Sequence, residues 1–125
     1  MDYKLFSKTV GIKKSTEIAT FSTEHTVRDF CYSGNSVNEK EFYFIHGPYI
    51  GSISNNKVNL NWSGSEYGEN YADIENSLYF YPSSMFYHKN TKNMYIVENA
   101  GRKIRKIELL CDFEVSITKD NIERE

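Results

Sequence analysis

Histidine is the residue type in this chain with the widest chemistry, because imidazole transfers protons near neutral pH and also ligates metals. The chain has three, His25, His46 and His88, and no two of them are close in the sequence. A metal or catalytic site would need several histidine, carboxylate and arginine groups at spacings that bring them together. We find no such set, so we expect structural or surface histidines, no catalytic residues, no metal, no cofactor and no enzymatic activity.

The densest basic run, at residues 102–106, could supply cations to a phosphate-binding surface. On a strand, alternation would divide these cations between the two faces, with Lys106 on one and Lys103 and Arg105 on the other. The simpler interpretation is a strand with solvated cations; the alternative is an RNA-binding face that uses Arg102 and Arg105. Because 15 basic and 17 acidic residues leave a net charge of −2, we do not expect nucleic acid as a partner.

Aromatic residues could form a binding surface of another kind. Tyr67 and Tyr71 precede the cluster Tyr79-Phe80-Tyr81, and tyrosine is favoured at protein interfaces. The alternative is that these rings fill a core between layers of the fold. The candidate interaction surface therefore consists of Tyr67, Tyr71, Arg102 and Arg105.

The two cysteines, Cys31 and Cys111, belong to no Cys-x-x-Cys pair, so we interpret them as buried free thiols. The longest apolar runs, such as 42–45 and 78–81, are far shorter than the roughly 20 residues of a membrane span. The first residues show no cationic segment followed by an apolar one, as a secretory signal would. We therefore expect an intracellular protein with no membrane partner.

Composition favours strands as the elements that position these residues. The chain has 125 residues, which fits one domain, and it contains 17 valines and isoleucines against 8 alanines and leucines. With 15% aromatic residues, its apolar side chains are those that suit a pleated, half-buried surface. The sequence therefore predicts an all-β protein.

Short apolar runs separated by Gly, Asn and Ser turns mark the expected strands. They cover residues 3–10, 17–22, 27–32, 41–46, 50–54, 57–62, 84–88, 94–98, 103–110 and 113–118. Residues 71–78 alone resemble a helix, and we expect at most one turn there, with Asp73 as its cap.

The strand pattern repeats along the chain. Residues 43–47 align with residues 95–99 at an offset of 52. The segment that begins at Ile50 aligns with the one that begins at Ile104, at an offset of 54 residues. The segment that begins at Phe30 aligns with the one that begins at Met85, at an offset of 55 residues. The blocks keep their order, and length differences fall in turns. A period of about 50 residues is typical of a four-stranded propeller blade.

The second copy carries three segments in order, which are YPSSMFYH (81–88), KNMYIVE (92–98) and NAGRKIRKI (99–107). This succession resembles the NHL repeat, a β-propeller blade motif with a proline-led strand, a Leu-Tyr-Val-Ala-Asp strand, a Gly/Asn loop and an Arg-Ile-Arg-Lys-Ile strand. Residues 27–62 resemble a degenerate preceding blade. His46 and Glu98 depart from the motif, since the family usually has a small residue there.

The resemblance implies antiparallel four-stranded meanders, about two blades of an NHL-type propeller. The expected parts are N-terminal strands at 1–26, a degenerate blade at 27–62, an NHL-like blade at 63–118 and a solvated tail at 119–125. Propellers close with 4–8 blades. Two blades therefore imply a segment of a larger chain or assembly, and a closed two-layer β-sandwich is the alternative.

The expected function is non-catalytic protein binding or scaffolding, with a protein partner or self-association through exposed blade faces. Two alternatives stay open. One is a ligand- or metal-binding enzyme propeller with most of its site in other blades, and the other is the RNA-binding face described above.

Overall fold

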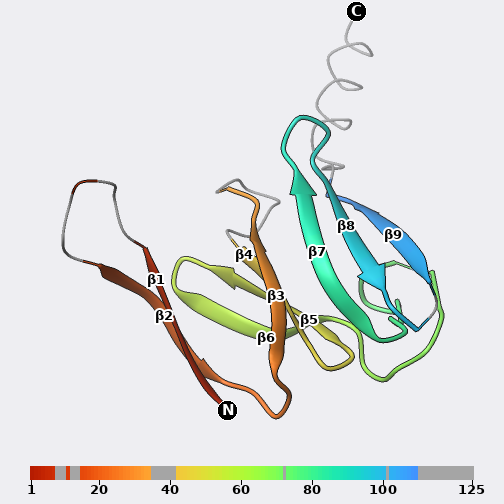
Figure 1. Ribbon diagram of the computed structural model, residues 1–125, viewed down its shortest axis with the longest axis horizontal. Helices are drawn as coiled ribbons and strands as arrows, with labels where there is room; N and C mark the ends of the chain where they lie inside the picture. Colours follow the sequence, from red (N-terminus) through yellow and green to blue (C-terminus); the bar gives the residue numbers. More distant parts are fainter. Residues whose placement is uncertain (8–10, 12–14, 35–41, 72, 101, 110–125) are drawn as a thin grey trace, which may run out of the picture.

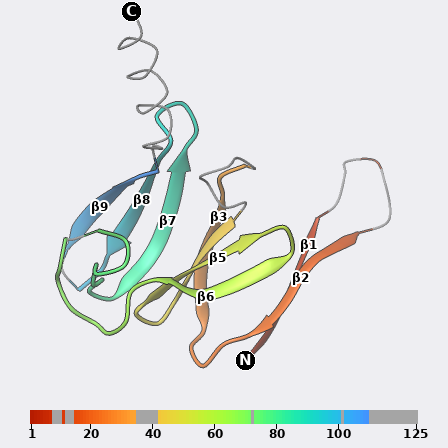
Figure 2. The same cartoon turned by 180° about the vertical axis from the view of Figure 1, so that it is seen from behind.

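The computed structural model describes residues 1–7, 11, 15–34, 42–71, 73–100 and 102–109. These residues form nine strands in three antiparallel sheets of two, four and three strands, which confirms the all-β expectation. The sheets lie side by side in chain order, with the two-stranded sheet at one end (Figure 1) and the three-stranded sheet at the other (Figure 2). Nowhere do the described residues form a helix with the length and apolarity that crossing a membrane requires.

The first sheet is a hairpin of β1 (Asp2–Ser7) and β2 (Thr16–Ser22). Its two faces differ in chemistry because side chains alternate along a strand. The cross-strand pair Leu5 and Ala19 packs into an apolar cluster with the second sheet, whereas the neighbouring pair Lys4 and Thr20 is exposed. The hairpin therefore packs apolar residues on its inner face and exposes mainly polar ones, although Phe6 of β1 is also exposed.

The second sheet is a four-stranded meander in chain order. Its strands are β3 (Val27–Tyr32), β4 (Phe42–His46), β5 (Tyr49–Ser54) and β6 (Lys57–Ser63). Each strand begins and ends within one residue of its predicted position. Asn55 and Asn56 join β5 to β6 with positive φ angles of 53° and 64°, as a tight two-residue hairpin turn requires.

The third sheet is a meander of β7 (Pro82–His88), β8 (Asn93–Glu98) and β9 (Lys103–Glu108). β7 begins two residues before the predicted start, because proline is tolerated as the first residue of a strand and a bulge follows it. The predicted strand at 113–118 and the tail at 119–125 lie outside the described residues.

Residues 64–81 connect the second sheet to the third. Two isolated bridges, Tyr67 with Tyr79 and Asn70 with Leu78, fold this connection back on itself. Between them is the expected single turn, in which Asp73 Oδ1 accepts the backbone N–H of Asn76 at 3.0 Å. The described part of the connection thus folds back on itself and lies against β9, where Arg105 bonds to the carbonyls of Asn70 and Leu78.

The main core lies between the second and third sheets. It contains these buried side chains from both sheets and the connection: Tyr43, Ile45, Ile50, Tyr79, Met85, Met94, Ile96, Ile107 and Leu109. A second, smaller core of Ala19, Phe44 and Ile53 lies between the hairpin and the second sheet. Residues of β4 are therefore buried on both faces, which makes the second sheet the middle layer.

The strand register agrees with the repeat predicted from the sequence. In the second sheet Phe30 is opposite Phe44. Their equivalents at the predicted offsets, Met85 and Ile96, are opposite each other in the third sheet. Likewise Ile45 is opposite Ile50, and the equivalent pair is Val97 with Ile104. Equivalent residues therefore occupy equivalent places in two sheets.

The described residues form a stack of three sheets that does not close into a ring. Since there are three layers, the two-layer sandwich does not describe them. Contacts between the sheets come from side chains and loops; for example, Asp29 Oδ2 of β3 accepts the backbone N–H of Met85 in β7 at 2.9 Å.

Candidate functional site

The outer face of the third sheet is open to solvent and carries an apolar patch beside polar residues, among them Lys106, which is opposite Tyr95. Phe86 is 57% exposed and Ile104 is 71% exposed, while Val97 is exposed and Tyr95 is half-buried. Phe86 is opposite Tyr95 and Val97 is opposite Ile104, so the four form one continuous patch. We call Phe86, Tyr95, Val97 and Ile104 the open face.

In the second sheet, the positions equivalent to the open face are buried. The repeat offsets map the open face onto Cys31, Tyr43, Ile45 and Ile50. Three of these are buried in the main core and Cys31 packs against it, because the third sheet covers them. The open face is thus the place where a further sheet would stack if the arrangement continued.

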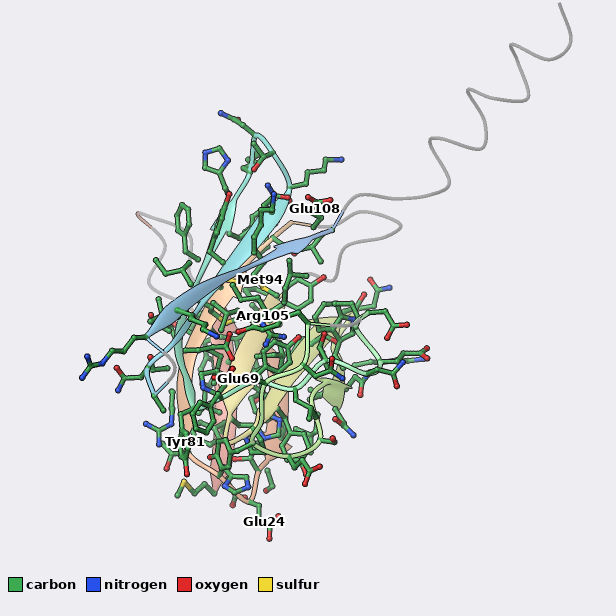
Figure 3. All side chains as sticks on the ribbon, turned by 90° about the vertical axis from the view of Figure 1, so that its right-hand side faces the viewer. Glu24, Glu69, Tyr81, Met94, Arg105 and Glu108 are labelled. Carbon is green, nitrogen blue, oxygen red and sulfur yellow. The ribbon has the colours of Figure 1, made fainter. Side chains whose placement is uncertain are left out.

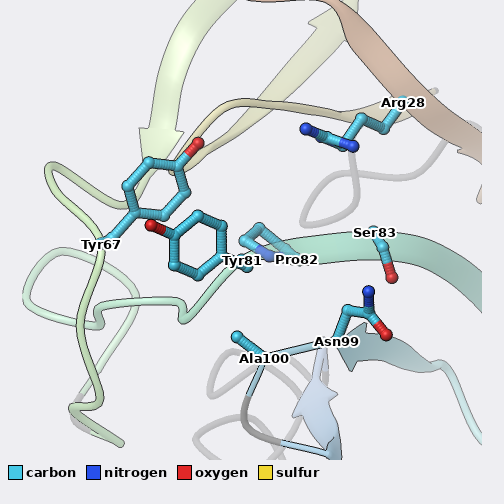
Figure 4. Close-up of a pocket in the computed structure, with 7 residues that line it drawn as sticks. All are labelled: Arg28, Tyr67, Tyr81, Pro82, Ser83, Asn99 and Ala100. Carbon is cyan, nitrogen blue, oxygen red and sulfur yellow. The ribbon is translucent and has the colours of Figure 1, made fainter.

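A crevice of about 270 Å³ lies beside the junction of the second and third sheets (Figure 4). It is lined by Arg28, Tyr67, Tyr81, Pro82, Ser83, Asn99 and Ala100. The rings of Tyr67 and Tyr81 stack with their centroids 4.2 Å apart. Tyr67, predicted as an interaction residue, is therefore partly exposed on the wall of this crevice.

Tyr81 has an uncommon backbone conformation for an aromatic residue, with a φ of 54° immediately before Pro82. Hydrogen bonds on both sides hold it there. Its carbonyl accepts the N–H of Asn99 at 3.0 Å, and the preceding N–H, of Phe80, donates to Glu98 Oε1 at 2.7 Å. These bonds fix the Tyr81 ring against Tyr67.

A buried ion pair joins β8 to β9 beneath the connection. Arg105 is 7% exposed and Glu98 is 1% exposed, and Arg105 Nε donates to Glu98 Oε2 at 3.1 Å. The same guanidinium donates to the carbonyls of Asn70 at 3.2 Å and Leu78 at 2.6 Å. Arg105 is labelled in Figure 3, which views the molecule from the side of the third sheet.

The prediction that Arg105 contributes to an exposed interaction surface is therefore wrong. Its guanidinium carbon lies 4.3 Å from the ring centroid of Tyr71 and 4.4 Å from that of Tyr79, so the cation is enclosed by rings, carbonyls and a carboxylate. Alternation placed Arg105 on the same face as Ile107, and that face is the inner one.

The other predicted residues lie apart from each other. Tyr71 is exposed, and its ring covers the guanidinium of Arg105. Hydrogen bonds with Tyr71 and Glu69 raise the pKa of Lys103. Arg102 is exposed in the β8–β9 turn with a φ of 53°. The structure thus brings Tyr71 and Arg105 together and separates them from the open face.

His46, at the position equivalent to Glu98, is also buried at the end of its strand. Its Nε2–H donates to the carbonyl of Leu60 at 2.6 Å, and within the described residues Nδ1 has no hydrogen-bond partner. Burial lowers the pKa of His46, and the charge of His25 lowers it further, although the bond to Leu60 acts in the opposite direction. The ring is therefore neutral at pH 7.

This lowered pKa predicts that the free energy of unfolding decreases as the pH is lowered below about 6.5, because the unfolded chain protonates His46 more readily than the folded chain does. The slope from this residue is at most about 1.4 kcal/mol per pH unit. Urea unfolding at several pH values should give a shallower dependence for His46→Gln than for the unmodified chain. His88→Asn, on β7, is the control, and equal slopes for His46→Gln and the unmodified chain would contradict the prediction.

Cys31 agrees with its predicted role as a largely buried thiol. Burial, together with the charge of Asp29, raises its pKa to about 12. A thiol with this pKa is almost entirely protonated at neutral pH and is therefore a poor nucleophile. Cys111 lies outside the described residues.

Sequence reasoning did not select the open face or the crevice. The signal for the open face was present, because the repeat offsets already paired Ile50 with Ile104. The sequence does not show that the third sheet buries Ile50. Of the residues that line the crevice, the sequence indicated only Tyr67 and Tyr81, since Arg28 and Asn99 belong to separate sheets and no local pattern links them.

The comparisons with known proteins add no family. No protein-family model, no curated protein and no solved structure matches the chain. Within the described residues, no group of three or more histidine, cysteine or acidic side chains could hold a metal ion. The candidate site therefore depends on the geometry of the open face.

Proposed function

We propose that this chain is a non-catalytic segment of an NHL-type β-propeller that binds or scaffolds other proteins through its open face. One observation carries the proposal. The open face has apolar residues at the four positions whose equivalents in the second sheet pack against a neighbouring sheet. A partner sheet on the open face would repeat that contact.

The blade assignment rests on the sequence motif at 81–107, and the strand order β7-β8-β9 is compatible with it. A blade is apolar on both faces and needs a neighbour on each. The hairpin covers one side of the second sheet, and the third sheet covers the other. Further blades, from the same chain or another, are the natural cover for the open face.

The RNA-binding alternative has lost support, because the guanidinium of Arg105 is enclosed and only Arg102 of the two arginines is exposed. An enzyme propeller has no supporting arrangement among the described residues. Protein binding is the function that uses an exposed sheet face with an apolar patch.

Light scattering on the purified chain tests this proposal. At high concentration we expect a weight-average mass above the 14.6 kDa of one chain. Ile104→Glu, which places a charge in the open face, should return the mass to that of a monomer. Thr20→Glu, on the polar face of the hairpin, is the matched control and should change nothing. A monodisperse monomer of the unmodified chain, with cooperative unfolding, would contradict the proposal.

A further inference from the structure

The crevice beside the junction of the second and third sheets has an unpaired cation on its wall. Arg28 of β3 is exposed, and among the described residues its guanidinium has neither a hydrogen bond nor an ion pair. The neighbouring carboxylate of Asp29 accepts the backbone N–H groups of Phe30 and Met85, each at 2.9 Å. None of the described residues that line the crevice is acidic. An anionic group could therefore enter it without meeting a like charge.

Two stacked tyrosine rings form another part of the same wall. The ring planes of Tyr67 and Tyr81 differ by 12°, and the two residues remain 38% and 46% exposed. Because aromatic rings pair well in offset stacks, a ligand that carries a flat ring could extend this one. Tyr81 holds its place with a positive φ, and backbone strain of this kind is concentrated at functional sites.

The crevice also offers a polar group that can donate to an anion. Figure 4 shows the side chains of Arg28 and Asn99 on opposite sides of the segment formed by Pro82 and Ser83. The side-chain amide of Asn99 has no hydrogen-bond partner among the described residues, whereas Ser83 Oγ already donates to the carbonyl of Val97 at 3.3 Å. At about 270 Å³ the crevice is slightly smaller than a typical ligand pocket, so it suits a small ligand.

We propose that this crevice binds a small organic carboxylate that carries a flat ring, with the carboxylate on Arg28 and the ring against the tyrosines. A guanidinium is planar and donates two parallel hydrogen bonds to a carboxylate, so one arginine is enough to orient the ligand. Arg28 is the one cation among the described lining residues, which suits the single charge of a carboxylate better than the larger charge of a phosphate. This inference is independent of the proposed function, because the crevice shares no residue with the open face.

Titration of the full chain with benzoate, followed by NMR, tests the inference. We expect saturable shifts of the backbone amide resonances of Ser83 and Asn99, which line the crevice. Acetate lacks the ring and benzyl alcohol lacks the charge, so each should bind at least about 10-fold more weakly than benzoate. Phenyl phosphate, which carries the same ring, should bind no more tightly than benzoate.

Three variants locate the binding. Arg28→Gln should weaken benzoate binding at least about 10-fold, and Tyr67→Leu should weaken it about 3- to 10-fold. Lys4→Gln removes an exposed cation from the hairpin, away from the crevice, and should leave the affinity unchanged. The amide spectrum of each variant without ligand would show whether it still folds. The absence of saturable shifts with benzoate, an equal affinity of Arg28→Gln and Lys4→Gln, or tighter binding of phenyl phosphate would overturn the inference.

Discussion

Replacing Arg105 with methionine is expected to lower the free energy of unfolding by about 3–5 kcal/mol. The change leaves the Glu98 carboxylate, which is 1% exposed, without its cationic partner. It also removes one of two donors from each of the carbonyls of Asn70 and Leu78, which keep only the backbone bonds that they accept from each other's residue at 3.1 and 3.4 Å. Because these carbonyls belong to the connection, the loop over β9 should loosen as well. Urea unfolding measures the loss, and hydrogen exchange of the Phe80 amide reports on the loop.

Two further variants test the cause. Lys103→Met, on the same strand, removes the exposed ion pair with Glu69, which is a 3.2 Å contact, and should lower stability much less than Arg105→Met does. Combining Arg105→Met with Glu98→Leu removes both buried charges and should recover only part of the loss, because the N–H of Phe80 then lacks its acceptor. If Arg105→Met were no more destabilising than Lys103→Met, the buried pair would not hold the connection.

Replacing Gly51 with alanine should lower the free energy of unfolding by about 1–3 kcal/mol, because the added methyl group would overlap the ring of Phe44. Gly51 is opposite Phe44 in the β4–β5 ladder, and the tip of that ring occupies the space beside the glycine in the core beneath the hairpin. Thermal or urea unfolding measures the change. In a Phe44→Leu background, Gly51→Ala should destabilise less, since the ring that it displaces is gone; an equal effect in both backgrounds would contradict the explanation.

The strands could be predicted from the sequence because alternation and turn residues act locally. Asn55 and Asn56, for example, form the predicted turn between β5 and β6. The repeat offsets also agree with the register, since Val97 is opposite Ile104 as Ile45 is opposite Ile50. Whether the sheets belong to an NHL-type propeller stays a prediction.

The burial of Arg105 could not be predicted, since alternation gives the two faces of a strand without saying which is covered. Gly51 of the second sheet is the equivalent of Arg105 in the third. Gly51 is opposite Phe44, whose ring leaves no room for a side chain, whereas Arg105 is opposite the smaller Ile96. The stacking of Tyr81 on Tyr67 depends on a positive φ before proline, which no local pattern indicates.

The chain-order arrangement of the sheets has a consequence for folding. Every strand ladder among the described residues joins neighbours in the sequence, so each sheet can form from contacts that close only short loops. Contacts between sheets, such as that of Asp29 with Met85, span more than 50 residues and bring together surfaces that are already built. The planes between the sheets are thus where partial unfolding would begin, because a layer can separate there without breaking any ladder.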